Sequence, residues 1–544
     1  MHIRKLHIEN FKKFKGSFDL ELSNDLNIIV GDNEAGKSTI LEAIFLALTG
    51  IFRGRYIRNE LSSYIFNKDI VDDYIESVKS GTAIRPPKVL VELFFAGDDA
   101  PAIFRGTYNS EKSDACGISL AVEFDEKFND EYEILINSKQ IRSLPIEYYD
   151  VTWNSFAWDN KITGRLIPLK VALIDSDNGK LPNGSDIYIS RIIKDNLDID
   201  DIVGITQAFR GLQDDFSDNQ SVRDINDNIK GTTAITDKEI GISVDLSSRN
   251  AWESFLMTYL DNIPFTYIGK GEQAIVKTNL ALGNKRASTA GVILMEEPEN
   301  HLSHTKMNEL ISYIKHHCKD KQLIISTHSS FVANKLGLSK LILLNGTKTL
   351  RLSELDSDTE AYFESLPGYN TLRLILCKKA ILVEGPSDEL VVQRAYLDKN
   401  DKLPIEDGID VISAYNLSFL RFLEIAGKLE LNVCVITDND GDIAALKRKY
   451  QAYVNSQHIK ICYDMNINTS PVKIGGKEYN CNTLEPNLLK ANSLDVICKA
   501  ISKSFNTEEA LLQYMKEHKT DCALAIFKSK ERINYPQYIL DAIQ

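Results

Sequence analysis

The chain has 544 residues, of which 43% are hydrophobic and 26% are charged, and its formal net charge is −14. This composition is typical of a globular protein, and the length predicts roughly three to four domains. No apolar stretch reaches the ~18 residues that cross a bilayer, which argues against a membrane protein, and the acidic balance argues against a protein that coats DNA by charge alone.

The N-terminus begins with Met-His-Ile-Arg-Lys and leads into a strand-like alternation instead of the apolar core of a signal peptide. The eight cysteines are scattered and form no Cys-x-x-Cys pair. That spacing favours reduced thiols over disulfides or a zinc site. We therefore expect a cytoplasmic protein.

A phosphate-binding loop follows the first buried strand. Residues 26–31 form an apolar run that predicts a strand, and apolar residues recur at helical spacing over 40–48. The sequence Gly-Asp-Asn-Glu-Ala-Gly-Lys-Ser at 31–38 lies between them, in the strand-to-helix context of a P-loop. Lys37 should reach the β- and γ-phosphates of a nucleotide, and Ser38 should bind Mg²⁺. The predicted nucleotide contacts are Gly31, Asn33, Gly36, Lys37, Ser38 and Thr39.

A long segment without obvious chemistry follows. Residues 84–180 predict a meander of strands, for example over 88–95 and 118–124. No sustained heptads occur, so a long coiled-coil arm is not expected. Residues 185–235 predict helices with polar breaks, which we interpret as a small inserted dimerisation unit. The alternative is a surface excursion without function.

Three further motifs come next. Gly269, Gly271 and Gln273 open a helix-compatible stretch, and two glycines at a helix start make an anion-binding turn. The apolar run 292–295 ends in Glu296, a candidate for the Mg²⁺ shell, and Glu297, a candidate for polarising the attacking water. A second apolar run at 322–326 is followed by His328, which could contact a γ-phosphate.

The order of these motifs resembles that of the ABC-type ATPases of the SMC and RecF group. The resemblance implies a head-to-head dimer with ATP between the subunits. Gly269, Gly271 and Gln273 would then contact the nucleotide of the partner, Glu297 would be the catalytic carboxylate and His328 the switch histidine. Two departures, Glu296 in place of the usual Asp and no glutamine before Gln140, suggest an ATP clamp with slow hydrolysis.

Regular strand–helix alternation begins near residue 375 and predicts a parallel sheet, with one of its helices over 419–429. The strand-like run 380–383 ends in Glu384, with Asp388 four residues on, and the run 432–437 ends in Asp438 and Asp440. Carboxylates at the carboxyl ends of parallel strands gather at one sheet edge. Hard oxygen ligands suit Mg²⁺ or Mn²⁺, and a pair of ions can cut a phosphodiester. The candidate ligands are Glu384, Asp388, Asp438, Asp440 and Asp442.

This pattern resembles a Toprim domain, and the whole chain resembles the OLD (overcoming lysogenization defect) family of ATP-dependent endonucleases. The resemblance adds Glu485, in Asn-Thr-Leu-Glu-Pro-Asn, as a metal ligand. It also assigns Lys519 to the transition-state phosphate, with Lys528 and Lys530 as competitors for that role.

The predicted fold class is therefore α/β: an N-terminal ABC-type (SMC/RecF-like) ATPase with an inserted helical dimerisation unit, and a C-terminal Toprim domain with a parallel sheet. The expected domains are 1–184 and 236–360 for the two parts of the ATPase, 185–235 for the insert and 370–544 for the Toprim nuclease.

We expect an enzyme that binds ATP and nicks or cleaves DNA with Mg²⁺ or Mn²⁺. Two ions would bind in the Toprim site and one with ATP. The expected assembly is a homodimer or a higher even-numbered oligomer. The resemblance implies a role in anti-phage defence, in some relatives beside a helicase or a retron reverse transcriptase with its single-stranded DNA. The alternatives are a DNA repair ATPase and clamp whose Toprim domain binds metal and DNA without cutting, and a primase or topoisomerase-like enzyme.

Overall fold

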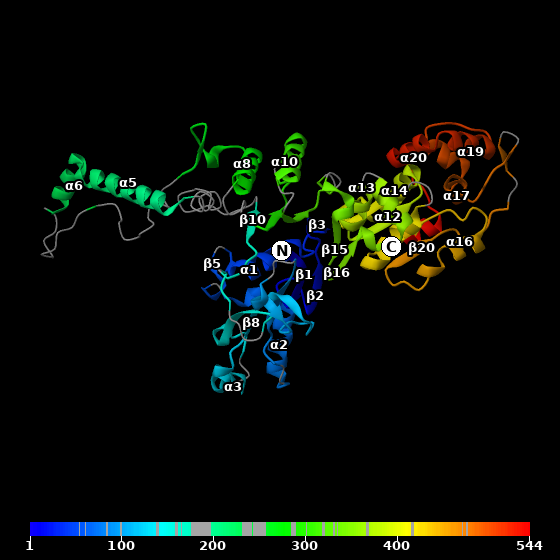
Figure 1. Ribbon diagram of the computed structural model, residues 1–544. Helices are drawn as coiled ribbons and strands as arrows, with labels where there is room; N and C mark the ends of the chain where they lie inside the picture. Colours follow the sequence, from blue (N-terminus) through cyan, green and yellow to red (C-terminus); the bar gives the residue numbers. More distant parts are fainter. Residues whose placement is uncertain are drawn as a thin grey trace. The chain divides into compact units, whose positions relative to one another are not determined.

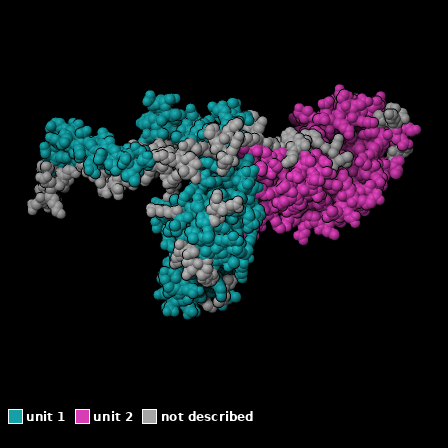
Figure 2. All heavy atoms as spheres, viewed as in Figure 1, with its two compact units in different colours: residues 1–11, 21–26, 40–326 teal, residues 12–20, 27–39, 327–544 magenta. Residues whose placement is uncertain are grey.

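The computed structural model describes two compact units (Figures 1 and 2). Unit 1 comprises Met1–Phe11, Glu21–Leu26 and Ile40–Ser326, and unit 2 comprises Lys12–Leu20, Asn27–Thr39 and Thr327–Gln544. The phosphate-binding loop thus belongs to the same unit as the C-terminal third of the chain. The described residues are all of 1–544 except 54, 60, 83–84, 98–100, 138–140, 158–161, 165, 176–196, 231–241, 243–256, 284–289, 301, 318–320, 330–331, 334–335, 366–368, 415–417, 470–471 and 475–476.

Unit 1 contains an antiparallel sheet. Strand β1 (His2–Glu9) pairs with β6 (Val89–Ala96), and β6 pairs with β8 (Ala115–Phe124). Strand β8 also pairs with β7 (Arg105–Gly106) and β9 (Tyr149–Ser155). The strands predicted over 88–95 and 118–124 are therefore confirmed. The same region also contains helix α3 (Asn129–Asn137), which the strand pattern did not predict.

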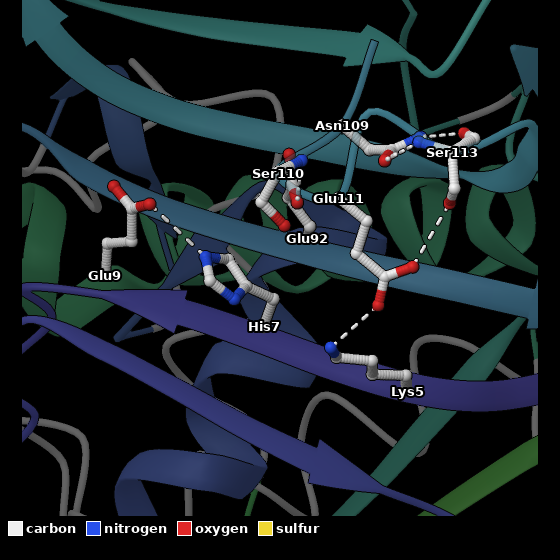
Figure 3. Close-up of polar contacts among 8 residues, drawn as sticks. All are labelled: Lys5, His7, Glu9, Glu92, Asn109, Ser110, Glu111 and Ser113. Carbon is white, nitrogen blue, oxygen red and sulfur yellow. Dashed lines mark hydrogen bonds and ion pairs between the residues drawn. The ribbon is translucent and has the colours of Figure 1, made fainter. Parts of the chain in front are cut away.

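One face of this sheet carries charged side chains (Figure 3). Because side chains alternate along a strand, Leu6 and Ile8 lie in the core while Lys5, His7 and Glu9 point to the other face. We call Lys5, His7, Glu9, Glu92 and Glu111 the sheet cluster. Lys5 Nζ donates to Glu111 Oε1 (2.8 Å), His7 Nε2 lies 3.3 Å from Glu9 Oε1, and the Ser110 amide donates to Glu92 Oε2 (2.9 Å).

Unit 1 also contains three parallel strands, β10 (Val171–Asp175), β13 (Val292–Glu296) and β14 (Gln322–Thr327). Strand β13 is an almost wholly buried apolar run, and β14 is buried along its whole length with Leu323, Ile324 and Ile325 at its centre, as expected for parallel strands covered on both faces. The strands predicted at 292–295 and 322–326 are these two.

The other elements of unit 1 are helices and short strands. Helix α2 begins after Asn67, whose side chain accepts from the Asp69 and Ile70 amides, and ends at Gly81 with φ 78°. The segment predicted to be an inserted helical unit contains α5 and α6 in its described part, 197–230; residues 185–196 and 231–235 lie outside the described residues. The bounds are α2 (Lys68–Ser80), α5 (Ile199–Asp218), α6 (Gln220–Lys230), α8 (Lys270–Gly283), α10 (His304–His317), β4 (Ile51–Phe52), β5 (Arg55–Tyr56), β11 (Tyr259–Leu260) and β12 (Ile263–Pro264).

The first part of unit 2 surrounds the phosphate-binding loop. Strand β3 (Leu26–Gly31) matches the predicted strand and leads through the loop into α1 (Lys37–Thr49), whose later residues belong to unit 1. Strand β3 pairs in parallel with β15 (Leu341–Asn345), and β15 pairs antiparallel with β16 (Lys348–Arg351). Strand β2 covers Ser17–Glu21, and helices α12 (Ser357–Ser365) and α13 (Tyr369–Ile375) follow β16.

The rest of unit 2 is built on a four-stranded parallel sheet with the order β18-β17-β19-β20. Its strands are β17 (Lys379–Val383), β18 (Ile409–Ser413), β19 (Val433–Ile436) and β20 (Ile459–Cys462). The expected parallel sheet is therefore present, and α15 (Phe419–Leu429) has the predicted bounds.

Buried side chains of this sheet and of the C-terminal helices form one core, which includes Ile381, Val391, Leu488, Leu511 and Ile539. The remaining elements are α14 (Pro386–Asn400), α16 (Ile443–Lys449), α17 (Leu484–Ala491), α18 (Leu494–Ala500), α19 (Glu508–Glu517), α20 (Lys519–Lys528), α21 (Gln537–Ala542), β21 (Lys473–Ile474) and β22 (Lys477–Glu478). Among the described residues, no helix combines the length and the apolar character that crossing a membrane requires.

Candidate functional site

The phosphate-binding loop requires glycine at two positions for steric reasons. A Cβ on Gly31 would lie 2.6 Å from the Leu344 carbonyl oxygen of the neighbouring strand, and a Cβ on Gly36 would lie 2.8 Å from the Phe14 ring. Gly36 also has φ 106°, a conformation that side chains disfavour. The backbone can therefore wrap closely in this loop, as phosphate binding requires.

Lys37 lies inside the loop, with only 5% of its surface exposed. Its Nζ donates to the carbonyl oxygens of Gly31 (2.9 Å) and Asp32 (3.0 Å) and lies 3.2 Å from His328 Nδ1. The Asn33 amide donates to Asp32 Oδ1 (2.7 Å), and Ser38 and Thr39 follow Lys37 in the first turn of α1. The predicted loop lysine and the predicted histidine are thus brought together.

The two predicted acidic residues of unit 1 lie at the carboxyl end of β13. Glu296 is the last residue of that strand, and Glu297 follows it with φ 41°. The Glu297 amide donates to the Ser326 carbonyl (3.0 Å), and its Oε2 accepts from Asn300 Nδ2 (3.1 Å). A left-handed conformation at a non-glycine residue is uncommon and is found at functional sites, which makes Glu297 the strained residue of this strand end.

The glycine-rich turn lies at the start of α8. Gly269 precedes the helix and its carbonyl accepts from the Glu272 and Gln273 amides, while Gly271 is the second residue of the helix. The Gln273 side chain donates to the carbonyls of Phe265 (2.9 Å) and Ile268 (2.8 Å). The space beside Gly269 is open, because a Cβ added there would have no atom within 4 Å.

The second candidate site is the acidic cluster, which we define as Glu384, Asp388, Asp438, Asp440 and Glu485. Glu384 follows β17 and Asp438 follows β19, so both lie at the carboxyl edge of the parallel sheet. Glu384 Oε1 accepts from the Asp438 amide (3.0 Å), which ties the two strand ends together. Asp388, in the first turn of α14, accepts from the Gly385 amide (3.2 Å), and Glu485 lies buried in the first turn of α17.

Burial and mutual repulsion raise the pKa values of two carboxylates of the cluster. Burial raises the pKa of Asp438 to about 9, with further contributions from Glu384, Asp388, Glu485 and Asp440. Burial raises the pKa of Asp388 to about 7, with contributions from Glu384 and Glu485, whereas Lys519 acts in the opposite direction. Accumulated carboxylates that resist ionisation are typical of sites that hold cations.

The donor set fits a hard divalent cation, because carboxylate oxygens are the ligands that Mg²⁺ and Mn²⁺ prefer. Asp440 has φ 48° and is followed by Gly441 with φ 81°, so the chain turns sharply at the sheet edge. Among the described residues, no three His, Cys, Asp or Glu side chains converge tightly enough to enclose an ion. The fit therefore rests on the chemistry and mutual proximity of the carboxylates.

The predicted lysine also joins this cluster. Lys519, the first residue of α20, has its Nζ 3.4 Å from Glu485 Oε1. Lys528 and Lys530 instead line a surface hollow of about 350 Å³ together with Lys499. Of the three candidates, Lys519 is thus the one beside the carboxylates.

Asp442 has a different environment from the other predicted ligands. Its carboxylate accepts from the Ala445 amide (2.8 Å) and caps the N-terminus of α16.

Two positioning side chains were not predicted. Thr437 Oγ1 donates to Glu384 Oε1 (2.8 Å), and Asn480 Nδ2 donates to Asp440 Oδ1 (2.8 Å). Thr437 directly precedes Asp438, so its position in the sequence was a usable signal. Asn480 lies 40 residues from Asp440, and no local pattern connects the two.

Comparison with protein families gives two matches. The family model described as AAA domain matches residues 5–324. The family model described as overcoming lysogenization defect protein-like, TOPRIM domain matches residues 375–440. The first match contains the phosphate-binding loop and Glu296, and the second contains Glu384, Asp388, Asp438 and Asp440.

Among curated proteins, the chain is similar to the DNA replication and repair protein RecF of Shewanella loihica, with 39% identity over 69 residues. That match covers 13% of this chain and 18% of the relative, so the chain matches less than a fifth of the length of this relative. It is also similar to Endonuclease GajA of Bacillus cereus, with 21% identity over 476 residues, 81% of this chain and 75% of the relative.

Among solved structures, the chain is similar to an SMC head bound to the C-winged helix domain of ScpA, with 16% identity and a TM-score of 0.33 over 65% of this chain and 99% of that one. The SMC head domain from Thermotoga maritima gives 16% identity and a TM-score of 0.28 over 64% and 97%. These scores are too low to support a structural argument.

Proposed function

The chain belongs to the AAA domain family and joins that domain to a Toprim domain of the OLD kind, and on this premise we propose that it cuts DNA with divalent metal ions under the control of bound ATP. The observation that carries the proposal is the acidic cluster beside Lys519. A cluster of carboxylates at the carboxyl edge of a parallel sheet, with the buried Glu485 beside Lys519, suits metal-assisted phosphodiester cleavage better than a role in packing.

In this proposal the ligands for Mg²⁺ or Mn²⁺ are the carboxylates of Glu384, Asp388, Asp438, Asp440 and Glu485. Asp442 is a further candidate. When bound, two such ions supply an activated water and stabilise the leaving oxygen. Thr437 and Asn480 orient Glu384 and Asp440 through the hydrogen bonds that they donate. The Lys519 ammonium offsets negative charge that develops on the cut phosphate.

The nucleotide half of the proposal concerns the loop and the end of β13. The phosphates and Mg²⁺ of ATP are bound by the loop residues Gly31, Asn33, Gly36, Lys37, Ser38 and Thr39. Glu296 completes the Mg²⁺ shell. Glu297 orients the attacking water, and His328 contacts the γ-phosphate. Gly269, Gly271 and Gln273 contact the nucleotide of a second copy in a homodimer. This division assigns 1–184 and 236–360 to the ATPase, 185–235 to dimerisation and 370–544 to the nuclease.

The similarity to a relative named Endonuclease GajA supports DNA as the substrate. We further propose a cytoplasmic protein that acts in anti-phage defence, alone or beside a partner gene product such as a helicase or a reverse transcriptase with its single-stranded DNA.

A second candidate function is a DNA repair ATPase and clamp whose Toprim domain holds metal and DNA without cutting. The similarity over 69 residues to a relative named DNA replication and repair protein RecF supports this candidate. Intact DNA binding without cleavage would distinguish this candidate from the nuclease.

The test is to incubate supercoiled plasmid and Mg²⁺ or Mn²⁺ with the protein, with and without ATP, beside Asp440→Ala and Lys37→Ala. The proposal expects cutting that disappears in Asp440→Ala and loses its response to ATP in Lys37→Ala. No cutting by the wild type under any condition, including in the presence of the neighbouring gene products, would refute the nuclease.

A further inference from the structure

Helix α13 contacts strands of both sheets in unit 2. It packs against β15, the strand next to the one that carries the phosphate-binding loop, and also against β18 of the four-stranded parallel sheet. Asn345, the last residue of β15, also donates from its side chain to the carbonyl of Leu429 (2.8 Å), the last residue of α15, and α15 packs against β19 of the parallel sheet. A side chain on α13 can therefore respond to the loop and act on the parallel sheet.

A cavity of about 260 Å³ lies beside this helix. Asp32 and His328 line it from the side of the phosphate-binding loop, and Arg373, Lys378 and Asp410 line it from the side of the parallel sheet. Asp32 and His328 are also the residues whose carbonyl oxygen and ring nitrogen contact Lys37 Nζ. The loop side of the cavity is thus the part of the loop that must change when Lys37 turns to bound phosphate.

Arg373 is mostly buried and is held by the parallel sheet. Its guanidinium donates to both carboxylate oxygens of Asp410 (2.6 and 2.8 Å) and to the Val411 carbonyl (2.8 Å), all on β18. A longer contact of 3.5 Å reaches Glu389 Oε1 on α14. Glu389 follows Asp388 of the acidic cluster in the sequence, so Arg373 is linked through Glu389 to the helix turn that carries Asp388.

We propose that Arg373 is a positioning residue that couples phosphate binding at the loop to the placement of Asp388 in the acidic cluster. This inference rests on the proposed function, because it assumes that the loop binds nucleotide and that the cluster holds metal.

Asp410 and Glu389 share the Arg373 guanidinium, with shorter contacts to Asp410 than to Glu389. Nucleotide phosphates bring negative charge to the loop and draw Lys37 away from Asp32 and His328, which changes the charge that faces Arg373 across the cavity. The paired, short contacts to Asp410 should persist because bidentate Arg–carboxylate pairs are strong. The longer contact to Glu389 should change first, and with it the first turn of α14 that carries Asp388.

The test uses hydrogen–deuterium exchange, which does not depend on DNA cutting. We would measure exchange in peptides that cover 384–389 and 409–413, with and without an ATP analogue whose β–γ bond cannot be hydrolysed, and measure binding of the analogue separately. In the wild type the analogue should change exchange in both segments. In Arg373→Gln the analogue should still bind, but the change at 384–389 should be lost.

Cutting gives the second readout. The ratio of cutting rates with and without the analogue should differ from one by about fivefold or more in the wild type, as is usual for coupled sites, and approach one in Arg373→Gln. Arg373→Lys keeps the charge and should restore part of the response, which a purely structural role would not predict. Arg421→Gln is the matched control, because Arg421 lies over the Tyr362 ring in the same unit and does not line the cavity.

If Arg373→Gln does not fold, Glu389→Gln removes the negative charge that faces Arg373 while its side-chain oxygen can still accept from Gln393, and it should abolish the same exchange response. An unchanged response at 384–389 in both variants would overturn the inference, as would a wild type that binds the analogue without any change there. A wild type that binds no nucleotide would refute the nucleotide half of the proposed function and this inference with it.

Discussion

The two charged clusters of the molecule differ in how their carboxylates are balanced. In the sheet cluster of unit 1, Glu111 is paired with Lys5, and Glu9 with His7 and Lys88. In the acidic cluster of unit 2, the charges of four other carboxylates oppose the ionisation of Asp438, and Lys519 lies 3.4 Å from Glu485. The proposed cation site therefore differs from the sheet cluster in its imbalance of charge.

The difference has a consequence for stability. Paired charges on the sheet fix a loop, residues 107–114, to the strands through Lys5 and through the Ser110 amide. Crowded carboxylates repel one another and weaken the fold until a cation binds. We expect substitutions in the acidic cluster to affect activity and those in the sheet cluster to affect stability, and the predictions below test this separation.

The largest loss of metal-dependent cutting is expected for Asp438→Asn. Loss of a direct ligand should lower metal-dependent cutting by more than ~100-fold, since loss of an outer partner of a metal site already costs about 10–100-fold. The denaturation midpoint measured without divalent metal should stay the same or rise, because one of the repelling charges is gone. Glu9→Gln is the control, and equal losses of cutting in both variants would remove the distinction between the clusters.

A smaller loss is expected for Lys519→Gln. The Lys519 side chain is 53% exposed, so its removal should slow cutting by about 10-fold, less than the 100-fold or more that a fully enclosed donor contributes. Single-turnover rates on plasmid would measure this effect. Lys528→Gln, in the separate hollow, should cut like the wild type; a larger loss there than in Lys519→Gln would reverse the assignment.

For the sheet cluster we expect a change in stability alone. Lys5→Met breaks the pair with Glu111, whose side chain is 35% exposed, and should lower the free energy of unfolding by about 1 kcal/mol or less. Urea denaturation would measure the loss, and plasmid cutting should be unchanged. Loss of cutting in a folded Lys5→Met protein would contradict a purely structural role.

The smallest expected effect is a pH-dependent change in stability caused by Glu92→Gln. Burial raises the pKa of Glu92 above its ordinary value, although the Ser110 hydrogen bonds and the nearby His7 act in the opposite direction. A raised acid pKa favours the folded state at low pH, and this contribution is lost as pH rises through the folded-state pKa. Glu92→Gln should therefore gain stability relative to the wild type between pH 4 and pH 8 in urea titrations; a difference that does not change with pH would contradict the shift.

Local patterns predicted the elements that position both candidate sites. Strand β3 and helix α15 have the predicted bounds because their apolar runs and periodicity are strong. The acidic residues at the ends of β17 and β19 were predicted because parallel strands end at one edge. Helix α3 was missed because it is short and lies among strands.

Contacts between distant residues could not be predicted. Lys5 meets Glu111 across 106 residues, and Arg373 meets Asp410 across 37. Such pairs depend on register and on the packing of helices against sheets, which one sequence does not encode in any local spacing.

The central claim is that the acidic cluster is a cation site, and direct metal titration tests it best. We would titrate Mn²⁺ calorimetrically into nucleotide-free wild type, Asp438→Asn and Glu9→Gln. The account predicts binding by the wild type and by Glu9→Gln, and weak or absent binding by Asp438→Asn. Equal Mn²⁺ affinity in the wild type and Asp438→Asn would contradict it.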